Sequence, residues 1–319
     1  MKAKIFAVGA AALLALLVLN TPISVAQQDV EPQTGFFQGA LGAKLFYRSW
    51  KAPQSKAAIV LVHGFGEHSG RYQEMAEHFL DQGLSVYALD HRGHGRSEGP
   101  RWNPESFDYY VEDLKTFVES VKQEERVDKV FMLGHSLGGE IALKYAILYP
   151  KDLEGLIVSG PAVGGYQAIP ILGRVEVSLS MERILSPLLS LMARFLPDMG
   201  MPGTMIDPSY LNHDPENYNA YANDPMVCHE PMKLRFQSEA LKAILFLQDN
   251  AQELKVPSLI MCGSEDVLVP PGSVKLFYEN ARLEDGKFII YEGFYHEIFN
   301  EVGKERVYAD VDAWLLPRL

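Results

Sequence analysis

Residues 130–139 read VFMLGHSLGG, and this segment is the strongest indication of the fold class. A run of β-forming side chains leads through a glycine into Ser136, and a helical pattern follows over residues 140–148. A strand, a sharp glycine-rich turn and a helix in this order push one hydroxyl out at the top of a sheet. The stretch therefore predicts an α/β fold that presents Ser136 as a nucleophile; the alternative role is a helix N-cap serine.

The same G-x-S-x-G pattern occurs a second time, at residues 95–99, so the pattern alone does not identify the nucleophile. Ser97 lies in a loop rich in glycine and arginine that runs into Pro100, with no strand before it and no helix after it. We expect a structural role for Ser97.

The rest of the chain alternates short β-rich runs with helical patterns. Strands are expected at residues 35–38, 44–50, 57–63, 85–90, 129–134, 153–159, 258–262 and 287–291, of which the first two suit an antiparallel pair. Helices are expected at residues 71–82, 109–122, 136–148 and 272–280 and at the C-terminus. Strands without clean polar alternation, separated by helices, predict a mostly parallel sheet that is covered on both faces.

The alternation is interrupted once, between residues 161 and 232. An apolar helical stretch over residues 181–196 is followed there by a segment rich in Pro, Asn, Asp and Met. Because a bare loop of this length is uncommon, we expect a helical cap or lid over the carboxyl edge of the sheet. The predicted organisation is a core from residues 34–160 and 233–319 with the cap at 161–232.

Composition limits the classes of partner. The chain has 319 residues, 47% hydrophobic and 22% charged, which is typical of one or two globular domains. Its 29 basic and 41 acidic residues give a net charge of −12, which argues against nucleic acid and anionic membrane surfaces as electrostatic partners. With Cys228 and Cys262 alone, neither a disulfide framework nor a four-thiolate zinc site can form, and we expect two unpaired thiols.

The first 26 residues have the order of a secretory signal peptide. Lys2 and Lys4 precede an apolar run over residues 5–19, and Ala26 ends a small-residue cleavage site. We predict cleavage after Ala26 and export to the periplasm or medium; the alternative is an uncleaved membrane anchor, for which the run is short. Cleavage removes two lysines and leaves 27 basic against 41 acidic residues, a net charge of −14.

A serine hydroxyl needs a base that a third group holds in place. In α/β sheets, functional residues lie in the loops after the carboxyl ends of strands. His296 follows the expected strand at 287–291, and Asp266 follows the one at 258–262. The chain order Ser136, Asp266, His296 fits such a triad, with Glu265 as the alternative acid.

Two backbone N–H groups are needed to stabilise the oxyanion of the tetrahedral intermediate. The N–H of Leu137, at the start of the helix after Ser136, is the natural first donor. The second should come from the loop after the strand at 57–63, where residues 63–66 read HGFG and let the backbone bend inward. We expect Phe65 to supply it.

Other histidines follow strands or share a loop. His63 and His135 lie too near the oxyanion-forming turns to serve as the distal base. His91 and His94 suggest a metal pair, but their loop offers no convincing third ligand. We therefore expect hydrogen bonding within a turn and predict no metal site.

Three motifs together resemble the monoacylglycerol lipase and lysophospholipase group of α/β-hydrolases. They read HGFGEHSGRY at 63–72, DHRGHGRS at 90–97 and GHSLGG at 134–139. The similarity runs from about Phe36 to the C-terminal helix and is weakest over residues 165–232. It implies an eight-stranded sheet, an apolar cap that receives an acyl chain, and an oxyanion hole formed by the residues chosen above.

The resemblance also points to substrate-binding residues. Glu67 and Arg71 match polar positions near the head-group end of the pocket; the alternative is a structural ion pair that holds the loop. His135 is a further candidate for substrate binding. The signal peptide and the cap sequence depart from the group, whose members are mostly intracellular, and the cap difference weakens any transfer of head-group preference.

The predicted function is a serine esterase that hydrolyses monoacylglycerols, or similar single-chain acyl esters, through an acyl-enzyme and without a metal or organic cofactor. Alternatives are a lysophospholipase, a short-chain carboxylesterase, an S33-type peptidase and a catalytically idle binding protein. The apolar residues of the cap helix have three possible roles: packing onto the body, lining an acyl tunnel, or transient contact with a lipid surface.

Overall fold

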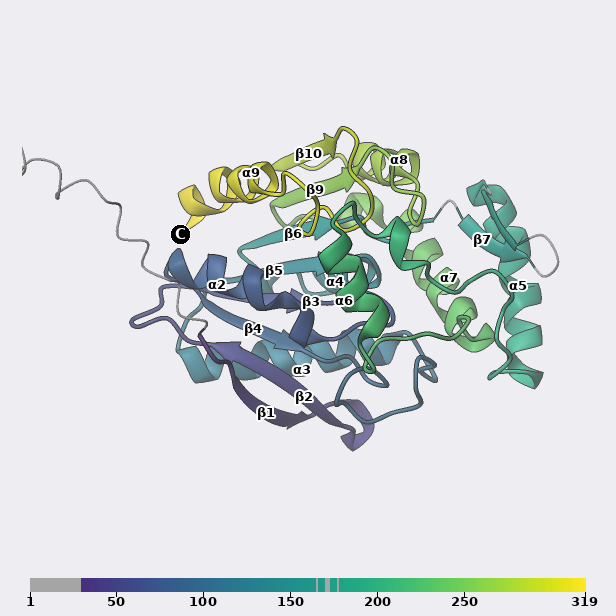
Figure 1. Ribbon diagram of the computed structural model, residues 1–319, viewed down its shortest axis with the longest axis horizontal. Helices are drawn as coiled ribbons and strands as arrows, with labels where there is room; N and C mark the ends of the chain where they lie inside the picture. The colour runs from purple at the N-terminus through teal and green to yellow at the C-terminus, as the bar shows by residue number, and fades with distance from the viewer. Residues whose placement is uncertain (1–29, 165, 170–172, 177) are drawn as a thin grey trace, which may run out of the picture. The chain divides into compact units, whose positions relative to one another are not determined.

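One mixed sheet of eight strands forms the centre of the molecule, in the order β1-β2-β4-β3-β5-β6-β9-β10 (Figure 1). Strands β1 and β2 run antiparallel to their neighbours, and all pairs from β4 to β10 are parallel. The strands are β1 Gln33–Gln38, β2 Lys44–Trp50, β3 Ala58–Val62, β4 Ser85–Leu89, β5 Val130–His135, β6 Gly155–Ser159, β9 Ser258–Gly263 and β10 Gly286–Tyr291. The predicted mostly parallel α/β sheet is confirmed.

This computed structural model describes residues 30–164, 166–169, 173–176 and 178–319. The predicted signal peptide, residues 1–26, lies outside the described residues, so cleavage and anchoring remain predictions. Residues 32–319 form one compact unit.

Strand β3 shows why its sequence lacks polar alternation. Ala58, Val60 and Val62 face one apolar cluster, shared with helices α3 (Asp108–Glu125), α4 (Leu137–Leu148) and α8 (Pro271–Ala281). Ile59 and Leu61 face a second cluster, shared with α2 (Gln73–Asp81) and α9 (Glu305–Leu315). Because helices cover both faces, every residue of β3 is buried and every position selects for an apolar side chain.

An insertion separates β6 from helix α7 (Leu234–Asp249). It contains the antiparallel hairpin β7 (Tyr166–Ile169) and β8 (Gly173–Glu176), then α5 (Leu179–Phe195) and α6 (Pro215–Asn223). Helix α5 packs against α7, which in turn packs against α4 (Figure 1). The helix predicted at 181–196 is confirmed as α5, whereas the hairpin, α6 and α7 were not predicted. The predicted cap is therefore not purely helical.

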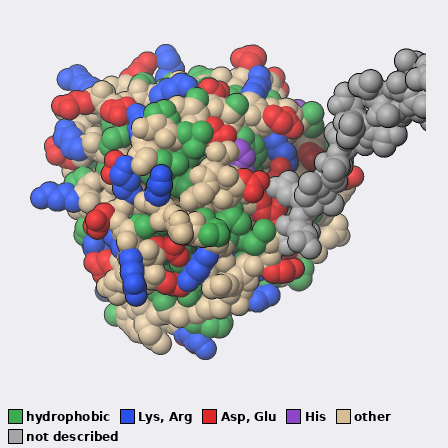
Figure 2. Space-filling view, turned by 90° about the vertical axis from the view of Figure 1, so that its left-hand side faces the viewer, with side chains coloured by type: hydrophobic (Ala, Val, Ile, Leu, Met, Phe, Trp, Pro, Cys, Tyr) green, Lys and Arg blue, Asp and Glu red, His purple; other side chains and the backbone are tan. Residues whose placement is uncertain are grey.

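Charged side chains of both signs share one face of the molecule. Figure 2 shows the face at the left of Figure 1, where basic and acidic side chains are interspersed. Cys228 and Cys262 are both buried and unpaired, as expected. Within the described ranges, no helix has the length and apolar character needed to cross a membrane.

Candidate active site

Ser136 stands at a sharp turn between β5 and α4. Its backbone has φ 54° and ψ −117°, in a region that side chains other than glycine rarely adopt, and such strain is typical of functional positions. The turn also brings backbone segments close together. A Cβ added to Gly138 would lie 1.9 Å from the carbonyl oxygen of Val62, and one added to Gly134 would lie 2.4 Å from that of Gly138. The glycines are required for the chain to present Ser136.

Ser97, the serine of the second G-x-S-x-G pattern, has the expected structural role. Its hydroxyl donates to the carbonyl of Asp90 at 2.6 Å and accepts the N–H of Phe46 at 2.8 Å. The side chain is buried, and its two bonds tie the loop to the residue after β4 and to β2. This hydroxyl is committed to holding the loop.

His296 and Asp266 come together after β10 and β9. Nδ1 of His296 lies 2.6 Å from Oδ2 of Asp266, and both side chains are buried. The other carboxylate oxygen of Asp266 accepts the N–H groups of Leu268 and Val269, both at 2.8 Å. The alternative acid, Glu265, is exposed. The geometry therefore favours Asp266 as the partner of His296.

A cavity of about 150 Å³ is lined by the predicted nucleophile, the predicted base and both predicted oxyanion-hole residues. Its wall includes Ser136, Leu137, Phe65 and His296. The remaining lining residues are mostly apolar and come largely from α7 and the segments beside it: Glu140, Ala162, Gly164, Thr204, Ile206, Met232, Phe236, Gln237, Ala240, Leu241, Ile244, Leu268 and Val269. The predicted nucleophile and the predicted base thus share one cavity with an apolar wall.

The two predicted oxyanion donors both border this cavity. Leu137 is the first residue of α4, where backbone N–H groups have no partner within the helix. Phe65 lies in the loop after β3, and hydrogen bonds hold a backbone group of each of its neighbours, Gly64 and Gly66. The N–H of Gly64 donates to Oε1 of Glu67 at 2.6 Å, and the carbonyl of Gly66 accepts the N–H of Cys228 at 2.7 Å.

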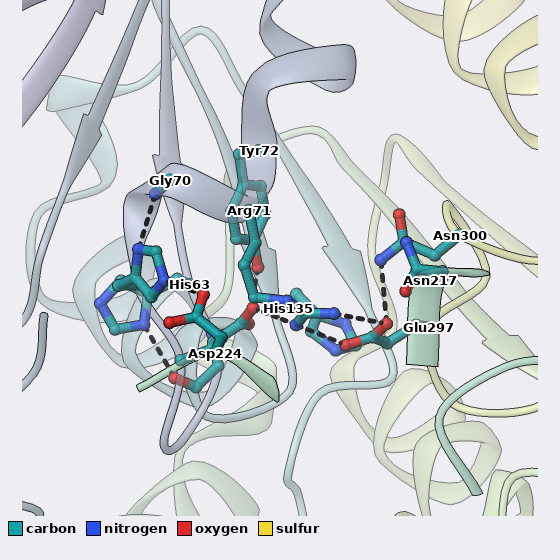
Figure 3. Close-up of polar contacts among 12 residues, drawn as sticks. His63, Gly70, Arg71, Tyr72, His135, Asn217, Asp224, Glu297 and Asn300 are labelled. Carbon is teal, nitrogen blue, oxygen red and sulfur yellow. Dashed lines mark hydrogen bonds and ion pairs between the residues drawn. The ribbon is translucent and has the colours of Figure 1, made fainter. Parts of the chain in front are cut away.

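Glu67 and Arg71 form the ion pair that the sequence allowed, as part of a larger network (Figure 3). Arg71 donates to Glu67 at 2.6 Å and to both carboxylate oxygens of Glu297, at 2.7 and 3.0 Å. The hydroxyl of Tyr72 donates to Glu67 at 2.9 Å. Burial raises the pKa of Glu297, but the Arg71 guanidinium outweighs it and lowers that pKa to about 2. Glu297 therefore stays ionised opposite Arg71 while the network holds the loop.

The same network lines a second, polar cavity of about 80 Å³. His135 lies in its wall with Glu67, Arg71, Glu297 and other residues from the cap and the C-terminal segment, among them Asn217 and Asn300. The ring of His135 is 4.7 Å from that of His296, so this cavity lies beside the base. Burial and His296 lower the pKa of His135 to about 4, which keeps it neutral near pH 7. All three predicted substrate-binding residues meet here, and their role stays a prediction.

The rings of His91 and His94, which suggested a metal pair, each hydrogen-bond to a backbone carbonyl. Nε2 of His91 donates to the carbonyl of His63 at 3.0 Å, and Nδ1 of His94 donates to that of Arg92 at 3.0 Å. Burial lowers the pKa of all three histidines, so they are neutral near pH 7. Among the described residues, no group of three or more candidate ligands is placed to hold a metal ion.

Sequence reasoning missed two carboxylates that the structure places at the site. Glu297 directly follows His296, and Glu140 is an acidic residue within the otherwise mostly apolar helix LGGEIALKYAIL. An acidic residue at a buried helix position was the available signal for Glu140. The pairing of Glu297 with Arg71 spans 226 residues, and no local pattern indicates it.

Comparisons with known proteins show the family of the chain. The sequence model of the serine aminopeptidase S33 family matches residues 53–303. A monoacylglycerol lipase of Mycolicibacterium smegmatis is 33% identical over 89% of this chain and 96% of its own, and a human monoglyceride lipase is 32% identical over 94% of each. The crystal structure of a Paleococcus ferrophilus monoacylglycerol lipase is 27% identical, with a TM-score of 0.74 over 86% of this chain and 99% of its own. The chain belongs to the serine aminopeptidase S33 family and is a serine hydrolase with the α/β-hydrolase fold.

Proposed function

We propose that this protein hydrolyses monoacylglycerols, and similar single-chain acyl esters, to a fatty acid and an alcohol through an acyl-enzyme on Ser136. One observation carries the proposal. Ser136 and His296 line a cavity with a mostly apolar wall, and Oδ2 of Asp266 lies 2.6 Å from Nδ1 of His296. Such a wall suits an acyl chain. The monoacylglycerol lipases among its relatives support the substrate class.

In the proposed reaction, Nε2 of His296 takes the hydroxyl proton of Ser136 while Oγ attacks the ester carbonyl. The carbonyl oxygen becomes an oxyanion and accepts the N–H groups of Phe65 and Leu137. Asp266 orients His296 and stabilises its protonated form. The leaving alcohol takes the proton from His296, and a water molecule then repeats the sequence to release the fatty acid.

The second cavity suits the head group of the substrate. Its side chains offer charged and amide groups that can hydrogen-bond to glycerol hydroxyls, namely Arg71, Glu297, Asn217 and Asn300. It adjoins the base through His135, on the polar side of the reacting centre. An ester with an apolar tail and a small polar head would thus span both cavities.

We also propose that α5 touches a lipid surface. Met181, Ile184, Leu188, Leu191 and Phe195 are spaced three or four residues apart and are 44–73% exposed. We call this set the α5 stripe. It does not line the catalytic cavity, whose apolar wall comes largely from α7. We therefore assign the acyl-tunnel role, one of the three possible for the cap helix, to α7. An exposed apolar helical stripe of this kind suits an interface with lipid.

Export of the protein is a further proposal, which rests on the sequence of residues 1–26. N-terminal sequencing of the protein from the periplasm or medium should begin at Gln27. Recovery of intact chains with Met1 in a membrane fraction would contradict cleavage.

A substrate panel tests the proposed function. Monoacylglycerols of several acyl lengths, lysophosphatidylcholine, p-nitrophenyl esters and an aminoacyl p-nitroanilide are compared by kcat/KM, with Ser136→Ala as the control. We expect the monoacylglycerols to be the best of the natural substrates and the anilide to be inert. A higher kcat/KM for lysophosphatidylcholine or the anilide would contradict the substrate class, and unchanged turnover by Ser136→Ala would contradict the mechanism.

A further inference from the structure

Glu140 places a carboxyl group in the wall of the catalytic cavity. It lies one helical turn after Ser136 in α4, and its N–H donates to the carbonyl of Ser136 at 3.1 Å. The side chain is 1% exposed and lines the cavity together with Ser136. Within the described part of the chain, its Oε1 is buried and has no hydrogen-bond partner. Buried polar atoms are nearly always hydrogen-bonded, so an exception that faces a substrate cavity needs an explanation.

Neighbouring charged groups do not satisfy this carboxyl. Lys144, one turn further along α4, donates instead to Asp108 at 2.6 Å and lies over the ring of Phe246. Glu182, on α5, is also buried and is likewise an acidic residue. Burial and Glu182 raise the pKa of Glu140, against the opposing effect of Lys144. This shift favours the protonated carboxyl, which offers both an O–H donor and a carbonyl acceptor.

The other polar side chains in the wall already bond to the backbone. The hydroxyl of Thr204 donates to the carbonyl of Met201 at 2.7 Å and accepts the N–H of Met232 at 2.8 Å. The amide nitrogen of Gln237 donates to the carbonyl of Met232 at 3.3 Å. Away from the reacting groups, Glu140 thus has unused hydrogen-bonding capacity where an acyl chain would lie.

We propose that Glu140 is a specificity-determining residue that hydrogen-bonds to a hydroxyl group on the acyl chain, so that the enzyme prefers esters of hydroxylated acids to those of unsubstituted acids. This inference rests on the proposed esterase function. Ser136, where the ester carbonyl would lie, and Glu140 line the same cavity and are four residues apart in the chain. Hydroxyls on the third and on the sixth carbon of the acyl chain place the group at two distances from the ester, so together they probe the reach of the carboxyl.

The hydroxyl is favoured over a cationic group because the wall around Glu140 is apolar. A neutral carboxyl can exchange two hydrogen bonds with a hydroxyl without separating charge. An ammonium group would require a buried carboxylate and would lose its own hydration in the cavity. The amine is therefore a contrasting arm of the test and not a second proposal.

The experiment compares four glycerol monoesters of equal chain length: those of hexanoic, 3-hydroxyhexanoic, 6-hydroxyhexanoic and 6-aminohexanoic acid. Wild type, Glu140→Leu and Glu140→Gln are assayed for kcat/KM on each. We expect wild type to prefer at least one hydroxylated ester to the hexanoate by about tenfold. Glu140→Leu should reduce that ratio about tenfold, and Glu140→Gln, which keeps a donor and an acceptor, should retain it within about threefold.

Failure of this inference is distinguishable from failure of the proposed function. A fluorophosphonate probe on Ser136 reports a working site in each variant, and hexanoate turnover by wild type reports the esterase itself. A wild type that hydrolyses hexanoate but shows no preference for either hydroxylated ester overturns the inference, whatever the variants do. A ratio unchanged in Glu140→Leu, or a stronger preference for the amino ester, also overturns it.

Discussion

Asp266 is held from two sides, with Oδ2 2.6 Å from Nδ1 of His296 and Oδ1 accepting two backbone N–H groups. The backbone bonds leave one carboxylate oxygen aimed at the imidazole. Nδ1 of His296 must then carry a proton toward the acid, which leaves Nε2 as the atom able to take a proton. The base function proposed for His296 therefore depends on an acid that is itself fixed by the loop after β9.

Replacing Asp266 should remove most of the activity without unfolding the protein. In Asp266→Asn, the amide can present its N–H₂ group and impose the wrong tautomer on His296, and we expect kcat to fall about 10⁴-fold. Glu265→Gln is the matched control, since this neighbouring acid is exposed. Steady-state kinetics on a soluble ester measures both. Comparable losses in the two variants, or none in Asp266→Asn, would contradict the assignment.

Glu67 should act as a positioning residue for the oxyanion loop. Its carboxylate accepts the N–H of Gly64 and the hydroxyl of Tyr72, so Glu67→Ala leaves both groups without their acceptor and frees the backbone next to Phe65. We expect kcat to fall about 10- to 100-fold. Glu67→Gln keeps the accepting oxygen and should lose less. The kcat values of both variants on one short-chain ester test this positioning role. A Glu67→Ala variant as fast as wild type would exclude it.

The Glu297–Arg71 pair should make stability depend on pH in the acid range. The folded state lowers the pKa of Glu297 from its ordinary 4.5 to about 2, so it stabilises the ionised form. This contribution is present above about pH 5 and is lost as the pH falls toward 2. Between pH 6 and pH 3 the loss is about 2 kcal/mol.

Urea unfolding at pH 6, 5, 4 and 3 checks this contribution. The difference in unfolding free energy between wild type and Glu297→Gln should shrink by about 2 kcal/mol over that range. The exposed control Glu265→Gln should track wild type throughout. A difference that stays constant with pH would mean that the pair does not depress the pKa of Glu297.

The sequence predicted those parts of the site that depend on local pattern. Ser136, Asp266 and His296 each follow a strand that β-rich runs made visible, and Phe65 follows another. Because carboxyl ends of parallel strands share one edge of the sheet, knowing the strands was enough to bring these residues together.

The parts of the fold and of the site that were not predicted depend on packing between distant segments. Helix α7 interleaves charged and apolar residues in KLRFQSEALK at residues 233–242, so its pattern was weak although α4 and α5 pack against it. Glu297 pairs with Arg71 from the far end of the chain, and no local pattern indicates that pair. Glu140 had a local signal, an acidic residue within a mostly apolar helix, but its place in the cavity wall beside Thr204 and Ile206 depends on distant segments.

The α5 stripe should bind neutral lipid vesicles. Changing Ile184, Leu188 and Leu191 together to Ser removes three exposed apolar side chains, and partitioning into phosphatidylcholine vesicles should fall at least tenfold. Val302→Ser, which removes an exposed apolar side chain elsewhere, should bind as wild type does. Because the contact is apolar, raising NaCl from 0.05 to 0.5 M should change binding less than about twofold. Cosedimentation with the vesicles measures the binding of wild type and of both variants, and the effect of salt. Loss of wild-type binding at 0.5 M NaCl would contradict an apolar contact.

Mass spectrometry of the protein treated with a fluorophosphonate tests the central claim most directly, because the probe bonds only to an activated serine. We expect one adduct per chain, mapped to the peptide that contains Ser136, and no adduct in Ser136→Ala. An unlabelled wild type, or an adduct on Ser97, would contradict it.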